Sequence, residues 1–228
     1  HEYNQWSELQ PERFRIFRAR ANQETQGFPY FLIRDLFAFR FEIAESDSAA
    51  VAREKLIAGI TEFMGEGTEE KAHFIGYMLG YPFAKSYYLR GILDEPQQIH
   101  NIALHYLTQF FTAVTSHLSE GTEGVPTPYP FQEGMPTVIL LEDIHWADES
   151  SLDVIQHLIK MCQDLPILII CSARPLLLER RPLWGEEQEH HIRLELCSLS
   201  KRENRRLVDE ILQYVDEIPP KLYSVIIS

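Results

Sequence analysis

The stretch that decides the fold is TVILLEDIHWAD, residues 137–148. An apolar run, 138–141, ends in two acids, Glu142 and Asp143, and a segment with helical spacing begins at Asp148. A continuous apolar run is typical of a strand that is buried on both faces of a parallel sheet. Packing alone does not explain two carboxylates at the end of such a strand.

The same alternation continues toward the C-terminus. A helix is expected over 148–163, a second apolar strand over 166–171, a shorter strand over 191–196 and a helix over 200–215. Apolar strands that alternate with amphipathic helices predict an α/β protein with a parallel sheet covered by helices on both faces.

The first half of the chain is predicted to be mostly helical. Alternating polar and apolar residues predict a strand over 13–17, and an irregular, tyrosine-rich segment is expected over 81–96. Residues 121–136, rich in proline and glycine, predict a surface loop or a domain hinge. The predicted architecture is an α/β sheet with a helical insertion at about 45–118. Helices are expected over 28–41, 47–64, 68–80 and 97–117, and the end of another helix over 1–10.

Composition restricts the class of protein. Asp and Glu total 34 and Lys and Arg 21, so the 228-residue chain has a formal net charge of −13. Binding nucleic acid or an anionic membrane requires a basic surplus, so neither partner is expected. The apolar run at 165–171 is much shorter than the roughly 20 residues of a membrane-spanning helix. Three cysteines without motif spacing and the absence of a signal-peptide pattern favour a cytoplasmic location.

The two acids have two explanations. Open α/β sheets bind ligands at the carboxyl ends of their strands, and Mg²⁺ takes one or two carboxylates together with waters and phosphates. Alternatively, Glu142 and Asp143 only turn the chain and cap the next helix. In the same segment, His145 is interpreted as a packing or hydrogen-bonding residue, Trp146 as buried, and Asp148 as a helix N-cap.

The stretch LLEDIHWADESSLDVI, residues 140–155, resembles the Walker B region of the STAND-type signalling ATPases within the P-loop NTPases. More narrowly, it is similar to the ATPase module found beside nucleotide cyclase domains and in large bacterial transcriptional regulators. The family usually has Asp where this chain has Glu142. The resemblance implies that Glu142 and Asp143 bind Mg²⁺ and ATP, Glu142 through water, and that Asp143 orients or deprotonates the attacking water.

A second motif, IICSARP at 169–175, follows the next strand. Its Arg174 is expected near the two acids, either as their salt-bridge partner or as a phosphate ligand. In the resembling family this position is sensor 1, so the resemblance implies that Arg174 reads the γ-phosphate of ATP through its bidentate guanidinium. Four other arginines in loosely similar segments are predicted to form surface salt bridges in preference to phosphate or interdomain contacts: Arg18, Arg20, Arg180 and Arg181.

A P-loop ATPase also needs Walker A, a glycine-rich loop that ends in Gly-Lys followed by Ser or Thr. None of the six lysines follows a glycine, so these 228 residues do not contain the motif. The resemblance places the first strand and the phosphate loop upstream of His1. A sheet without its central first strand has unpaired backbone groups, and we expect the chain to close the gap by rearranging or by dimerising.

These observations predict a truncated P-loop NTPase core over 1–199 and the start of a helical lid over 200–228. The expected function is an ATP-binding switch and slow ATPase in a multidomain signalling protein, with a cyclase or DNA-binding domain as its output. The chain itself is expected to bind Mg²⁺ and ATP weakly or not at all. A non-catalytic interaction module with the same fold is the main alternative. A metal-dependent hydrolase that uses Glu142, Asp143 and His145 is a third, and it lacks a second ligand cluster.

Overall fold

A computed structural model describes residues 14–116, 135–186, 188 and 190–211. The chain divides into two compact units, His1–Gln188 and Glu189–Ser228, and the candidate site lies in the first. The first unit contains β1 (Arg15–Arg20), η1 (Gln23–Thr25), α2 (Phe31–Arg40), α3 (Ala49–Met64), α4 (Glu69–Met78), α5 (Pro96–Ser116), β2 (Thr137–Glu142), η2 (Ile144–Trp146), α6 (Glu149–Met161), β3 (Ile167–Cys171) and α7 (Leu176–Arg180), and the second contains α8 (Lys201–Ile211).

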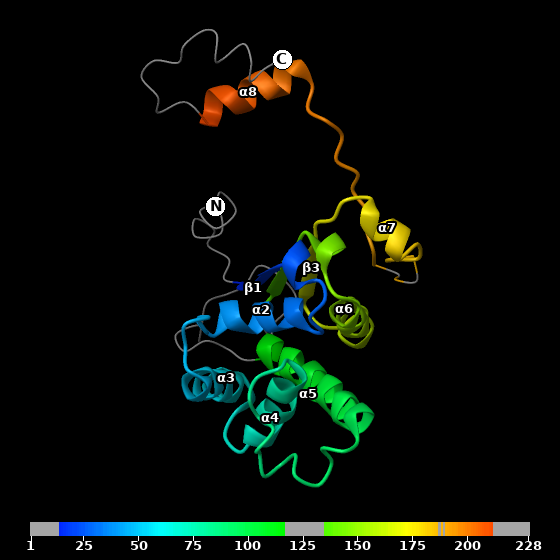
Figure 1. Cartoon of the computed structure of the whole chain (residues 1–228). Helices are drawn as coiled ribbons and strands as arrows, with labels where there is room; N and C mark the ends of the chain where they lie inside the picture. The colour runs from blue at the N-terminus through cyan, green and yellow to red at the C-terminus, as the bar shows by residue number, and fades with distance from the viewer. Residues whose placement is uncertain (1–13, 117–134, 187, 189, 212–228) are drawn as a thin grey trace. The chain divides into compact units, whose positions relative to one another are not determined.

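The three strands of the described sheet are parallel and lie in the order β1-β2-β3. Phe17 of β1 lies opposite Ile139 of β2, which lies opposite Ile169 of β3, so these side chains share one face. Both connections cross the sheet in the same direction. Because parallel crossovers are almost always right-handed, their helices fall on the same face. Figure 1 shows α2 and α6 beside the strands, where α2 packs against β1 and α6.

Aromatic side chains fill the core between the sheet and the helices. Phe17 makes edge-to-face contacts with Phe110 and Phe111 of α5, with ring centroids 6.1 and 5.5 Å apart. Phe37 of α2 lies 5.2 Å from Phe110, and all four rings are fully buried. Burying one such side chain stabilises the fold by about 2 kcal/mol. This cluster therefore anchors α5 to the sheet.

The helices α3, α4 and α5 pack on one another and form the helical insertion that the sequence predicts. Ser48 caps α3 by accepting a hydrogen bond from the Val51 N–H at 3.3 Å. Gly76 of α4 approaches the Phe83 ring so closely that an added Cβ would lie 2.2 Å from it. Between α4 and α5 the chain forms turns without a helix or strand, as predicted for the tyrosine-rich segment.

The opposite face of the sheet lies outside this core. Its side chains Ile16, Leu140, Leu168 and Ile170 are not part of the buried cluster that α2, α5 and α6 share. Leu168 is 58% exposed and Ile170 is 38% exposed. In the described part of the chain the helices of the core pack on one face of the sheet, because both crossovers run in the same direction. A cover of helices on the second face stays a prediction.

Three elements differ from their predictions. The first strand extends to Arg20, not 17, because Arg18 and Arg20 continue the register with β2. The predicted strand at 191–196 is not formed, and Leu196 there is 96% exposed. An alternating pattern makes a strand only when a neighbouring strand pairs with it, and no described strand does so. The short helix α7 was not predicted.

The interior gap expected in the sheet is not present among the described strands, because β1, β2 and β3 are direct neighbours and β3 is left at the edge. Two predicted features, the helix end at 1–10 and most of the loop at 121–136, lie outside the described residues. The boundary between the two compact units follows Gln188, whereas the sequence places a domain boundary after residue 199.

Candidate functional site

The carboxyl ends of β2 and β3 lie at one edge of the sheet and carry the predicted site residues. Glu142 ends β2, and Asp143 follows in the left-handed region with φ 55° and ψ 35°. Arg174 lies in the turn between β3 and α7. The Asp143 N–H donates to Ser172 Oγ at 3.2 Å and the Ile144 N–H to the Ser172 carbonyl at 3.0 Å. The turns that carry the acids and Arg174 are therefore hydrogen-bonded to each other.

Both acids form ion pairs with arginines of β1. Arg18 donates to Glu142 Oε2 from Nη2 at 2.7 Å and from Nε at 3.0 Å. Arg20 donates to Asp143 Oδ2 from Nε at 2.9 Å. The prediction of salt bridges for these arginines is confirmed. No ion pair joins Arg174 to either acid in the described structure, so the interpretation of Arg174 as their salt-bridge partner is wrong.

Each of these ion pairs uses one of the two oxygens of the carboxylate and leaves the other without a described partner. The Arg18 and Glu142 side chains are 33% and 29% exposed, and pairs this accessible contribute about 1 kcal/mol or less. Both arginines bind a single oxygen, so Glu142 Oε1 and Asp143 Oδ1 accept no hydrogen bond from the described residues. A ligand can therefore reach the free oxygens or displace the arginines at small cost.

The Arg174 side chain is exposed, and its guanidinium makes no hydrogen bond or ion pair with a residue that the structure describes. The backbone of the same residue is held, because its N–H donates to His145 Nδ1 at 3.3 Å. Arg174 therefore combines a fixed backbone with a cationic group that is available to an anion.

His145 is fully buried beside Trp146, with ring centroids 5.0 Å apart. Burial lowers the pKa of His145, the charges of Arg174 and Arg180 act in the same direction, and Asp143 opposes them. The ring is therefore neutral at physiological pH. The interpretation of His145 as a packing and hydrogen-bonding residue is confirmed, while Trp146, predicted to be buried, is partly exposed at the edge of the core.

Asp148 is the N-cap of α6, as predicted, and it also binds the start of α2. Its carboxylate accepts hydrogen bonds from the Ser151 N–H at 2.8 Å and Oγ at 2.6 Å. It accepts two more from the backbone N–H groups of Tyr30 (2.8 Å) and Phe31 (3.1 Å). The side chain is buried. One carboxylate thus joins the N-terminal ends of two helices to the turn that follows β2.

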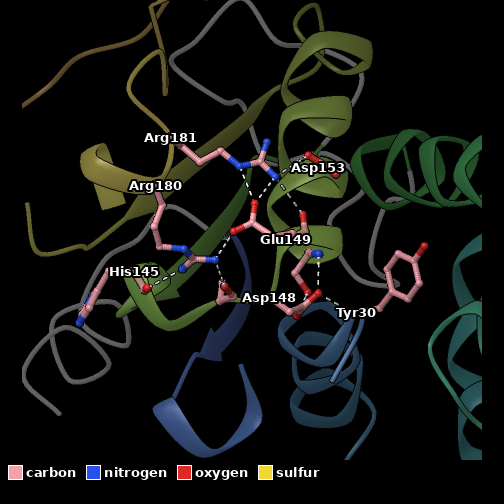
Figure 2. A network of polar contacts seen from close by, with 9 residues as sticks. Tyr30, His145, Asp148, Glu149, Asp153, Arg180 and Arg181 are labelled. Atoms are coloured by element: carbon pink, nitrogen blue, oxygen red, sulfur yellow. Dashed lines mark hydrogen bonds and ion pairs between the residues drawn. The ribbon is translucent and has the colours of Figure 1, made fainter. Parts of the chain in front are cut away.

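Arg180 and Arg181 reach from the end of α7 to the start of α6 (Figure 2). Both pair with Glu149, and Arg181 also pairs with Asp153 at 2.9 Å. Desolvation raises the pKa of Glu149, but hydrogen bonds from the two arginines outweigh it and hold the pKa below its usual value. The predicted salt bridges are confirmed.

Arg180 also makes backbone contacts that the sequence did not reveal. It donates to the carbonyls of His145 at 2.7 Å and Ala147 at 2.9 Å, so its guanidinium clamps the η2 turn (Figure 2). Every residue type has a backbone carbonyl and almost every one an N–H, so the sequence does not show which of them Arg180 or Asp148 will bind. This holds for the carbonyls that Arg180 contacts and for the Tyr30 and Phe31 N–H groups that donate to Asp148. These contacts follow only from the packing of α2 and α7 around η2.

The described residues at this edge offer two carboxylates and no complete set of protein ligands for a metal ion. Within the residues that the structure describes, no group of three or more His, Cys, Asp and Glu side chains is arranged to hold a metal. Two carboxylates with one free oxygen each match the one or two protein ligands that Mg²⁺ takes when phosphates and waters complete its shell.

The described helices include none with the length and apolar character needed to cross a membrane.

Comparisons with known proteins return no match: no protein-family model matches the chain, and neither the curated proteins nor the solved structures yield a similar one. The α/β fold with a parallel sheet and the geometry of its carboxyl edge are therefore the basis for a functional conclusion.

Proposed function

We propose that this chain is the part of a multidomain signalling protein that handles Mg²⁺ and ATP and acts as a nucleotide-dependent switch with slow ATPase activity. The observation that supports this most is the edge of the sheet where the turn that carries Glu142 and Asp143 is hydrogen-bonded to the turn that carries Arg174. Two acids and an exposed arginine at the carboxyl ends of adjacent parallel strands suit a phosphate with its metal ion.

Each of the three residues has a chemical role in the proposal. The free oxygen of Glu142 would hold the hydration shell of Mg²⁺, which neutralises phosphate charge when it is bound. Asp143 would bind the same ion and orient the attacking water or accept its proton, and Arg174 would donate to the γ-phosphate. The hydrogen bonds between the Asp143 and Ser172 turns hold these groups on one rigid frame.

The free edge of β3 suits a further strand. Its sequence ILIIC carries no charge, and Leu168 and Ile170 are exposed, whereas the opposite edge strand, β1, carries three arginines. Exposed edge strands are usually protected by charge, so an uncharged edge favours coverage by another strand.

A non-catalytic interaction module is the second candidate. It is favoured by the ion pairs of Glu142 with Arg18 and of Asp143 with Arg20, which already compensate both acids without a ligand. In that case the acids serve to join β1 to β2, and nucleotide has no role.

Titration with Mg²⁺ and ATP separates the two candidates. Affinity is measured by calorimetry for the 228-residue chain and for a chain lengthened at its N-terminus to include any glycine-rich loop of the parent. We expect micromolar to millimolar binding that is clearly tighter in the longer chain. In that chain, Arg174→Ala should weaken affinity roughly tenfold or more, because a charge-assisted hydrogen bond contributes about 1.5–3 kcal/mol.

Two further variants and a control complete the test. Glu142→Gln and Asp143→Asn should reduce the Mg²⁺ dependence of binding and abolish turnover, while Arg90→Ala, an exposed arginine of the helical insertion, should change neither. Equal affinity and turnover in all variants would refute the site, and absence of binding in the longer chain would favour the interaction module.

A further inference from the structure

The turn after β2 and the segment after β3 are joined by a group of hydrogen bonds. Besides the two contacts with Ser172, the Arg174 N–H donates to His145 Nδ1 at 3.3 Å. From the other end of the segment, Arg180 donates to the His145 carbonyl at 2.7 Å. His145 is the residue that receives bonds from both ends, one on its ring and one on its backbone.

The ring contact defines the protonation of His145. Nδ1 accepts the Arg174 N–H, so Nδ1 carries a lone pair and, in the neutral ring, the proton is on Nε2. Nε2 is enclosed and has no hydrogen-bond partner in the described part of the chain. Burying an unpaired donor costs about 1–3 kcal/mol. A phenylalanine of similar shape would avoid that cost, so the gain from histidine at this position must come from Nδ1.

We infer that His145 is a positioning residue for Arg174: through Nδ1, which accepts the Arg174 N–H, it holds the Arg174 backbone at the edge of the sheet that carries Glu142 and Asp143. The inference rests on the proposed function for the role of Arg174 as phosphate ligand. The hydrogen bond itself requires no nucleotide. Arg180 donates to the carbonyls of His145 and Ala147 and so binds the backbone of the same turn.

Three substitutions at His145 distinguish a role of its ring as hydrogen-bond acceptor from a role in packing alone. In His145→Asn, the amide oxygen can occupy the position of Nδ1 and accept the Arg174 N–H. In His145→Gln the polar group lies farther along the side chain, near the position of Nε2, and in His145→Phe there is none. Hydrogen exchange of the Arg174 amide, resolved by NMR on the full chain, reports the bond directly. Nitrogen chemical shifts of the wild-type ring report its tautomer.

The Arg174 amide is expected to exchange roughly fivefold to tenfold faster in His145→Gln and His145→Phe than in the wild type, the effect of losing one hydrogen bond. His145→Asn should restore most of the protection. The Ile144 amide, which bonds to the Ser172 carbonyl, should stay protected in all variants and shows that the turn remains folded. His73→Phe, at a partly buried histidine that pairs with Ser86 in the insertion, is the matched control and should leave Arg174 unchanged.

Equal exchange of the Arg174 amide in His145→Asn and His145→Phe, or an Nδ1–H tautomer in the wild type, would overturn the inference. If the exchange pattern follows the expectation, the ATP affinity of the lengthened chain should follow the same order, with Asn closest to the wild type. Unequal exchange with equal ATP affinity would also overturn the positioning role. Failure of the wild type and of every variant to bind ATP would refute the proposed function and leave the exchange result intact.

Discussion

Replacing Asp148 by alanine should destabilise the protein much more than the loss of an ordinary helix cap. Its buried carboxylate accepts four hydrogen bonds, two from Ser151 and one each from the Tyr30 and Phe31 N–H groups. The substitution leaves the Tyr30 and Ser151 N–H groups without an acceptor among the described residues, and the Phe31 N–H keeps only the Phe28 carbonyl at 3.3 Å. It also separates α2 from the turn that follows β2.

The magnitude follows from these contacts. A hydrogen bond to a charged group contributes about 1.5–3 kcal/mol, but bonds that share one acceptor are not additive. Each buried donor left without an acceptor costs about 1–3 kcal/mol, so the loss of the acceptor for the Tyr30 and Ser151 N–H groups gives an expected cost of about 2–6 kcal/mol for Asp148→Ala. Asp148→Asn keeps one acceptor oxygen and should lose about half as much. A single exposed N-cap contributes about 1 kcal/mol.

Urea unfolding of the full chain, followed by circular dichroism, measures the effect as a shift in midpoint at unchanged m-value. Ser48→Ala is the matched control, because Ser48 caps α3 with one hydrogen bond to Val51 and contacts no second helix through that oxygen. A loss for Asp148→Ala no greater than that for Ser48→Ala would refute the reasoning that one carboxylate joins two helices.

Two further predictions test the packing of the helical insertion and the titration of two partly buried histidines, His73 in the insertion and His157 in α6. Gly76→Ala should cost about 1–3 kcal/mol in urea unfolding, because its Cβ would meet the buried Phe83 ring at 2.2 Å, whereas Gly91→Ala, with nothing within 4 Å, should be nearly neutral. Burial lowers the pKa of His73 and His157, so the unfolded chain binds more protons and the free energy of unfolding should fall as the pH drops below about 6.5. The double replacement by Phe should flatten this dependence between pH 5 and 7, as measured by urea midpoints, and an unchanged slope would contradict the assignment.

Much of the fold follows from local patterns. The apolar runs at 138–141 and 166–171 predicted β2 and β3, and the 3.6-residue spacing predicted α5 and α6, with ends correct to a few residues. The segment 191–196 shows the limit of such patterns. Its alternation is as regular as that of β1, yet β1 has β2 beside it and 191–196 has no paired strand among the described residues.

The sequence by itself determined that two acids end one buried strand and that Arg174 follows the next. Because parallel strands end at the same edge, it also determined that these groups would lie close together. Only the tertiary structure decided their partners. Arg18 and Arg20 reach the acids because the register places β1 directly beside β2. The Arg174 guanidinium pairs with no residue that the structure describes, and the backbone of Arg174 is held by His145. Strand order and register bring together groups that are more than a hundred residues apart, and no local pattern encodes them.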